Sequence, residues 1–188
     1  IARNNLVLEV ESLVKKFSEI KQGFISSVGL LSSEELKTLE KSLYINVLNS
    51  ASKLPFKNNY KTPNSLGADR LALMAAAVSQ YSKKNVLVID AGSCITYDFI
   101  DSENNYLGGA IAPGIQMRYK SMADNTTSLP VLQKQVPKHS IGNSTNASIH
   151  SGVIHGVLYE IEGVVNEYQN KYSDLTIILT GGDADFLC

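Results

Sequence analysis

The sequence predicts an α/β protein built on a mixed β-sheet. Short apolar runs rich in Val and Ile alternate with longer segments whose apolar residues recur at helical spacing. The stretch 86–112 holds successive apolar runs joined by polar turns, which is typical of antiparallel strands. Further helices and strands on both sides of it favour a sheet with parallel neighbours as well. The 188 residues, 44% of them hydrophobic, suffice for one ordinary domain or two small ones with a sizeable core.

The first part of the chain is expected to contribute two helices and two strands. Apolar residues three and four apart predict a helix over 9–22, and a short strand follows over 23–28. The stretch Ser32-Ser33-Glu34-Glu35-Leu36 is a helix N-cap signal, because a serine hydroxyl can accept first-turn amides and acids suit the helix start. A second strand is expected over 43–48, and residues 49–66, rich in Asn, Ser, Lys and Pro, form a surface connection.

The remaining elements are predicted by stronger patterns. An Ala-rich, mostly buried helix follows Gly67, and the continuous apolar run 86–90 predicts a fully buried strand. After it we expect strands over 94–100 and 106–112, a helix from Pro113, a loop over 124–146, an amphipathic helix over 147–172 and a strand over 175–180.

Composition excludes several classes of protein. The 17 Lys and Arg residues balance 18 Asp and Glu residues, so the chain lacks the basic surface of a nucleic-acid-binding protein. No apolar run approaches the roughly 18 residues of a membrane helix. Two cysteines, Cys94 and Cys188, form no disulfide framework, and no signal peptide is recognisable. We therefore expect a cytoplasmic protein without a nucleic-acid or membrane partner.

The segment 86–98 is the strongest candidate for chemistry. The buried strand ends on the carboxylate of Asp90, and Gly92 then permits a tight turn with exposed backbone amides. Ser93 adds a hydroxyl donor, so the turn suits a phosphate beside a cation. Taken alone, an ordinary β-hairpin with a polar turn explains the same residues.

A second candidate is Gly67-Ala68-Asp69-Arg70 at a helix start. Asp69 is either a favourable charge at the helix N-terminus or a general base, with Arg70 binding an anionic group. The glycine-rich turns 108–114 and 180–184 each join a strand to a helix, where a nucleotide can approach the backbone closely. Neither turn is a Walker A loop.

The ordered combination of these segments resembles the type III pantothenate kinase family, within the acetate and sugar kinase/actin-like superfamily. The resemblance extends from about Gly23 to the end of the chain, and it rests on Tyr60, Gly67-Ala68-Asp69-Arg70, Asp90-Ala91-Gly92-Ser93, Thr96, Asp98, Gly108–Gly114, Thr145 and Thr180–Ala184. It implies a ribonuclease-H-like (actin-like ATPase) fold of two related halves, with mixed β-sheets and flanking helices.

The resemblance also implies how the chain is divided. Residues 1–80 correspond to the N-terminal half without its first phosphate loop, and residues 81–188 to the C-terminal half with the second phosphate hairpin. The second half is expected to be truncated at its end, so the sequence is expected to be incomplete at both ends. On this interpretation we expect the chain alone not to bind ATP productively.

The function implied by the resemblance is ATP-dependent phosphorylation of pantothenate to 4′-phosphopantothenate, the first step of coenzyme A biosynthesis. Asp69 is the implied general base, and the implied pantothenate-binding residues are Tyr60, Gly67, Ala68, Asp69, Arg70 and Thr145. Ser93 is the implied ATP contact, although Ser93-Cys94 stands where the family usually has Thr-Ala. Asp90 is the implied ligand of a monovalent cation, K⁺ or NH₄⁺, Mg²⁺ accompanies ATP, and the enzyme is a homodimer.

Two other functions are compatible with the same segments. A non-catalytic relative would bind a nucleotide or partner as a regulator, but Asp69 and Arg70 favour an enzyme because a binding module needs no base there. A sugar or acetate kinase of the same superfamily is disfavoured by the Gly67–Arg70 segment.

Overall fold

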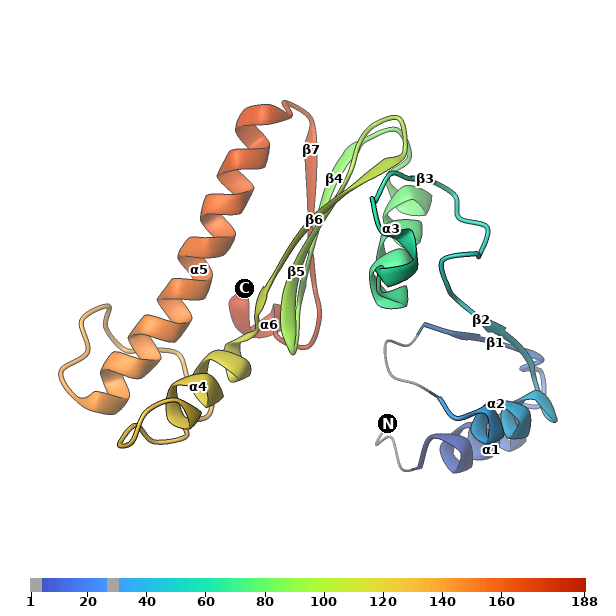
Figure 1. Cartoon of the computed structure of the whole chain (residues 1–188), viewed down its shortest axis with the longest axis horizontal. Helices are drawn as coiled ribbons and strands as arrows, with labels where there is room; N and C mark the ends of the chain where they lie inside the picture. The colour runs from blue at the N-terminus through green and yellow to red at the C-terminus, as the bar shows by residue number, and fades with distance from the viewer. Residues whose placement is uncertain (1–4, 27–30) are drawn as a thin grey trace. The chain divides into compact units, whose positions relative to one another are not determined.

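The computed structural model describes residues 5–26 and 31–188. Its contacts divide the chain into two compact units. One unit consists of Ile1–Leu54 and Tyr60–Ala76, and the other of Pro55–Asn59 and Ala77–Cys188. Helix α3 (Ala68–Gln80) begins in the first unit and ends in the second (Figure 1).

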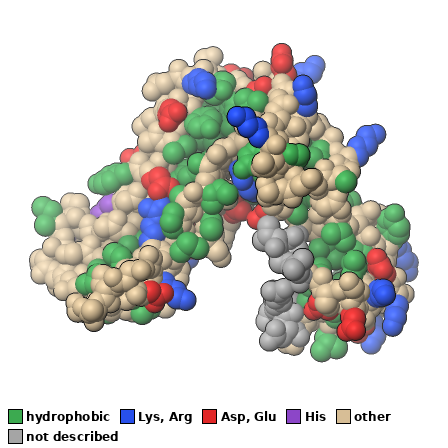
Figure 2. Space-filling model, viewed as in Figure 1, with side chains coloured by type: hydrophobic (Ala, Val, Ile, Leu, Met, Phe, Trp, Pro, Cys, Tyr) green, Lys and Arg blue, Asp and Glu red, His purple; other side chains and the backbone are tan. Residues whose placement is uncertain are grey.

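The first unit is a small β-α-β arrangement with an additional helix. Its elements are α1 (Leu6–Lys16), β1 (Gln22–Ile25), α2 (Ser33–Glu40), β2 (Tyr44–Val47), the short 3₁₀ helix η2 (Pro63–Ser65) and the start of α3. Strands β1 and β2 pair in parallel, from Gln22 opposite Tyr44 to Ile25 opposite Val47. Phe24 and Tyr44 remain largely exposed, and Figure 2 shows hydrophobic side chains among charged ones on the surface of this unit.

The predicted first helix was too long at its C-terminal end. Helix α1 stops at Lys16, because Phe17 leaves helical geometry at φ −123° and ψ 80°. The chain then makes a turn, with the Ile20 N–H donating to the Phe17 carbonyl, before extending into β1. The apolar spacing that predicted helix up to residue 22 therefore continues into a turn. Of the predicted strand 23–28, residues 27 and 28 lie outside the described part of the chain.

The N-cap predicted within Ser32–Leu36 is confirmed, and the structure assigns it to Ser32. The Glu35 N–H donates to Ser32 Oγ at 3.1 Å, and the Ser32 N–H donates back to Glu35 Oε2 at 2.8 Å. This reciprocal pair is a capping box, which satisfies amides that the first turn of α2 would otherwise leave without partners.

Ser32→Ala is expected to lower the free energy of unfolding by about 1 kcal/mol, because the alanine cannot accept the Glu35 N–H. Urea unfolding followed by circular dichroism measures the change. Ser33→Ala, one position further along α2, is the matched control, since Ser33 does not make the cap. Equal losses in the two variants would contradict the assigned role of the cap.

The second unit is a five-stranded mixed sheet with the strand order β3-β6-β5-β4-β7. Its elements are β3 (Lys57–Asn58), the end of α3, β4 (Asn85–Ala91), β5 (Cys94–Ile100), β6 (Asn105–Pro113), α4 (Ile115–Asp124), α5 (Thr145–Lys171), β7 (Leu175–Thr180) and α6 (Ala184–Leu187). Strands β4, β5 and β6 form an antiparallel meander, whereas β7 pairs in parallel with β4 and β3 in parallel with β6. The predicted mixed sheet is confirmed.

The main core lies between this sheet and α4 and α5, which cover the same face (Figure 1). Alternate residues of β4 and β5 point into it, as the two-residue period of a strand requires. The fully buried members include Leu87, Ile89, Ala91, Ile95, Tyr97, Phe99, Ile115, Tyr119 and Val157. Asp90, Thr96 and Asp98 are on the intervening positions of the strands, so they belong to the other face of the sheet.

Several predicted boundaries in this region differ from the structure by one or two residues, and one predicted connection contains regular elements. Helix α5 starts at Thr145 instead of Ala147, because Ser144 caps it by accepting the Ala147 N–H at 3.3 Å. The predicted connection 49–66 contains β3 and η2, which are too short to produce a periodic pattern. Within residues 5–26 and 31–188, no helix is long and apolar enough to cross a membrane.

Candidate active site

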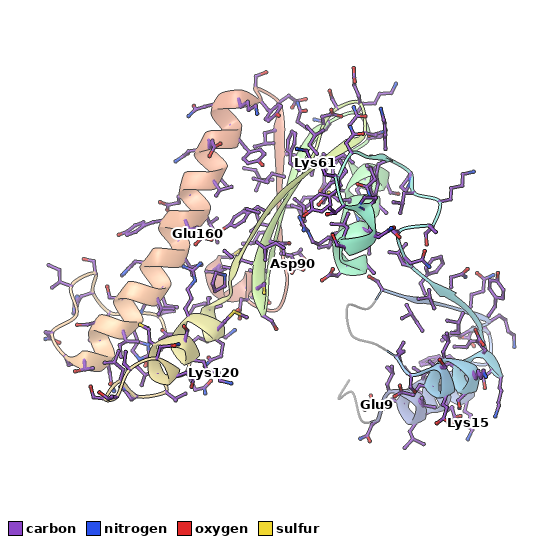
Figure 3. All side chains as sticks on the ribbon, in the orientation of Figure 1. Glu9, Lys15, Lys61, Asp90, Lys120 and Glu160 are labelled. Carbon is purple, nitrogen blue, oxygen red and sulfur yellow. The ribbon has the colours of Figure 1, made fainter. Side chains whose placement is uncertain are left out.

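The turn between β4 and β5 carries the first group of candidate residues. Gly92 and Ser93 make the turn, closed by the Gly92 N–H donating to the Cys94 carbonyl at 2.9 Å. The Ser93 side chain is exposed, whereas Asp90 is half-buried near the end of β4 (Figure 3). Asp90 stands opposite Thr96 of β5 on one side and Thr180 of β7 on the other. A carboxylate and two hydroxyls therefore share one region of the sheet beside the turn.

The start of α4 lies directly against this turn. The Gly114 N–H donates to the Ser93 carbonyl at 3.1 Å, and Gly114 is buried. A Cβ atom at position 114 would come within 2.1 Å of the Gly92 carbonyl oxygen and 2.5 Å of the Ser93 carbonyl oxygen. Only glycine permits this approach, so the turn is held from the side of α4.

The end of β7 approaches the turn in a similar way. Gly181 has φ +97°, and a Cβ atom there would lie 2.3 Å from the Ala91 carbonyl oxygen and 2.4 Å from Asp90 Oδ1. The Asp183 N–H then donates to the same Ala91 carbonyl at 2.9 Å. The Asp90-Ala91-Gly92-Ser93 segment is consequently held between two strand-to-helix junctions.

A lysine from the long loop joins the second of these junctions. Lys134 forms an ion pair with the Asp183 carboxylate, and its ammonium lies 5.3 Å from the centroid of the Phe186 ring. Lys134 and Asp183 are 49 residues apart. The ion pair ties the loop between α4 and α5 to the residues that contact the β4–β5 turn.

The donor set near the turn fits a hard monovalent cation. Asp90, Thr96 and Thr180 offer oxygen atoms on neighbouring strands, and Gly181 lets the backbone of the next junction come close to Asp90 Oδ1. Within the described part of the chain no group of three or more His, Cys, Asp and Glu side chains could hold a metal ion. Carboxylate and hydroxyl oxygens are ligands that suit hard cations.

The second group of candidate residues stands at the start of α3. The Leu71 N–H donates to the Gly67 carbonyl at 3.2 Å, which begins the helix, and Asp69 lies in its first turn. Asp69 is half-buried, and its Oδ1 accepts the Arg70 N–H at 2.8 Å. Asp69 therefore stands at the N-terminal end of α3, where an acidic side chain is favourable, and a carboxylate can serve as a general base.

Tyr60 and Arg70 meet in the same unit. The guanidinium carbon of Arg70 is 5.6 Å from the centroid of the Tyr60 ring, within cation–π range. Arg70 is only 6% exposed, while Tyr60 is half-buried. The structure thus places Tyr60 beside Arg70 of the Gly67–Arg70 segment.

Thr145 occupies a different element. It is exposed in the first turn of α5, next to a cavity of about 290 Å³ whose lining includes Asn143, Ser144 and His150. His150 Nδ1 lies 2.9 Å from the Tyr119 hydroxyl. Thr145 therefore belongs to the loop-and-helix region of the second unit and not to the β4–β5 turn.

A model of one protein family matches residues 2–167, and that family is described as type III pantothenate kinase. The chain belongs to the type III pantothenate kinase family. A protein of Flavobacterium johnsoniae with this name is 45% identical over 185 residues, covering 98% of this chain and 76% of the relative. The relative from Christiangramia forsetii is 49% identical over 177 residues, covering 94% and 73%. The resemblance stated from the sequence is confirmed.

One solved structure has a fold similar to that of this chain. It is a Campylobacter jejuni protein described as a Baf family transcriptional activator, with a TM-score of 0.56 and 24% identity. The match covers 95% of this chain and 75% of the other. At this identity the likeness concerns the arrangement of helices and strands alone.

The contacts of Gly114, Gly181 and Lys134 around the β4–β5 turn could not be predicted from the sequence. The sequence marked Gly114 and Gly181 as members of glycine-rich turns, but their approach to Ala91, Gly92 and Ser93 depends on the folded sheet. Lys134 carried no signal, because an isolated lysine in a polar loop resembles any surface charge.

Proposed function

We propose that this protein catalyses the ATP-dependent phosphorylation of pantothenate to 4′-phosphopantothenate, the first step of coenzyme A biosynthesis. The observation that carries the proposal is the match of residues 2–167 to the type III pantothenate kinase family. The half-buried carboxylate of Asp69 in the first turn of α3 supports it, because transfer to an alcohol needs a group that accepts the hydroxyl proton.

The proposed pantothenate-binding residues are Tyr60, Gly67, Ala68, Asp69, Arg70 and Thr145. Asp69 takes the proton of the pantothenate hydroxyl as that oxygen attacks the γ-phosphorus of ATP. The bond between the γ-phosphorus and the β,γ-bridging oxygen breaks, and ADP leaves. Arg70 and the Tyr60 ring that it contacts give this region a cation suited to the pantothenate carboxylate. Phosphoryl transfer requires mainly positioning and charge neutralisation, so a single base and well-placed donors suffice.

The proposed ATP contact is the turn that carries Ser93. Its hydroxyl and the neighbouring backbone amides can donate to phosphate oxygens. The proposed cation ligand is Asp90, which would hold K⁺ or NH₄⁺ beside the phosphates, where the ion would neutralise negative charge. Mg²⁺ is proposed to arrive with ATP, as is usual for nucleotide substrates.

The finer fold assignment is also part of the proposal. An antiparallel meander β4-β5-β6 followed by a helix and the parallel strand β7 is the strand arrangement expected of a ribonuclease-H-like half. We assign residues 81–188 to this half and residues 1–80 to a related one. A homodimer in the cytoplasm is the proposed working form.

A coupled assay on the full-length protein tests the function. We expect ATP turnover that depends on pantothenate, with 4′-phosphopantothenate identified by mass spectrometry, and higher turnover in K⁺ or NH₄⁺ than in Na⁺. Absence of pantothenate-dependent turnover in all these salts would refute the proposed kinase and favour a regulatory relative. Equal turnover in all of them would refute the cation requirement only.

A further inference from the structure

A polar contact between α4, α5 and β5 stands next to the proposed nucleotide turn without belonging to it. Arg118 Nη2 of α4 donates to Glu160 Oε2 of α5 at 2.6 Å, and the Tyr97 hydroxyl of β5 donates to Glu160 Oε1 at 2.8 Å. Glu160 lies midway along α5 (Figure 3). One carboxylate therefore joins two helices and the central part of the sheet.

The same arginine also contacts the backbone that leads to the turn. Arg118 Nε donates to the Pro113 carbonyl at 2.9 Å. The next residue, Gly114, donates its N–H to the Ser93 carbonyl at 3.1 Å. The guanidinium thus binds the carbonyl of the same peptide group whose N–H contacts the β4–β5 turn.

Burial makes these contacts stronger than ordinary surface pairs. The side chains of Arg118 and Glu160 are 21% and 30% exposed, so solvent screens them only in part. Tyr97 is 2% exposed, and burial, followed by its hydrogen bond to Glu160, raises the pKa of its phenol. The phenol stays protonated at neutral pH and remains a donor. Removing the arginine would leave a partly buried carboxylate without its cation.

We propose that Arg118 is a positioning residue for ATP, which together with Glu160 and Tyr97 fixes the Pro113-Gly114 peptide and thereby the Gly92-Ser93 turn that receives the phosphates. The proposal rests on the proposed function, since it assigns ATP to this turn. Arg118 acts through the backbone and does not itself contact the substrate.

Steady-state kinetics of the full-length enzyme test this role. Arg118→Met is expected to raise the KM for ATP about tenfold, the effect of losing a charge-assisted contact, with little change in the KM for pantothenate. Arg118→Lys keeps the charge but cannot donate to Pro113 and Glu160 in the same geometry, so it is expected to give most of that increase. Lys120→Met, at an exposed position of α4 (Figure 3), is the matched control and should leave both KM values unchanged.

A charge-swapped variant separates positioning from stability. Arg118→Glu combined with Glu160→Arg restores opposite charges between α4 and α5, but a carboxylate at position 118 cannot donate to the Pro113 carbonyl. We therefore expect the swap to recover part of the Tm lost in Arg118→Glu alone, while the KM for ATP stays raised. Recovery of the KM together with Tm would overturn the positioning role, because the ion pair alone would then be sufficient.

Hydrogen exchange gives a readout that does not depend on activity. In Arg118→Met, amides of residues 92–95 should exchange faster than in the unsubstituted protein. If Arg118→Met is too unstable to purify, Glu160→Gln is measured instead, with the same expected result. Unchanged exchange there would overturn the proposal. Absence of pantothenate-dependent turnover in the unsubstituted enzyme would instead refute the proposed function. Failure of the positioning role and failure of the proposed function are therefore distinguishable.

Discussion

Replacing Asp69 by asparagine is expected to reduce kcat by roughly 100-fold or more while the protein keeps its fold, because the amide cannot accept the proton of the pantothenate hydroxyl. The side-chain oxygen of asparagine can still accept the Arg70 N–H that Asp69 Oδ1 accepts at 2.8 Å. The start of α3 should therefore stay intact. The measurement is steady-state turnover, with circular dichroism and Tm as checks on folding.

A control is needed because Asp69 is also an acid in the first turn of a helix. Loss of that interaction alone costs about 0.3–1 kcal/mol, which affects stability and not the chemical step. Glu34, an exposed acid in the first turn of α2, provides the comparison through Glu34→Gln. If both substitutions leave kcat within a few-fold of the unsubstituted enzyme, Asp69 is a helix-terminal charge and the proposed base is wrong.

The parts of the fold predicted well are those in which local pattern and burial agree. The continuous apolar run 86–90 became β4, buried on both faces, and the long amphipathic segment became α5 within two residues at each end. A capping serine within 32–36 was equally recognisable, because the cap involves residues only three apart. In each case the physical cause lies within one turn or one strand of the chain.

The contacts that organise the candidate site could not be predicted in this way. Tyr97 and Glu160 are 63 residues apart, and Arg118 and Glu160 are 42 apart, so their contacts exist only once α4 and α5 have packed on the sheet. No sequence period relates such positions. The residues of the turn could be named from the sequence, whereas the residues that hold the turn required the structure.

Replacing Gly181 by alanine is expected to destabilise the second unit and weaken ATP binding together. The residue has φ +97°, a conformation that costs a side-chain-bearing residue about 1–3 kcal/mol. The added Cβ would also lie 2.3 Å from the Ala91 carbonyl oxygen, so the backbone must shift. We expect Tm to fall by roughly 5–10 °C and the KM for ATP to rise, because the shift moves the proposed phosphate turn.

Gly182 offers a matched control one residue away, because a Cβ atom there meets nothing within 4 Å. Gly182→Ala should therefore leave Tm nearly unchanged, because it makes the same glycine-to-alanine change without a collision of the added Cβ atom. The collision at position 181 also involves Asp90 Oδ1, at 2.4 Å. If Asp90 holds the cation, Gly181→Ala should raise the K⁺ concentration needed for half-maximal activity as well. If Gly181→Ala lowers Tm but leaves the KM for ATP and the K⁺ requirement unchanged, the close approach of Gly181 contributes to stability and not to the function of the turn.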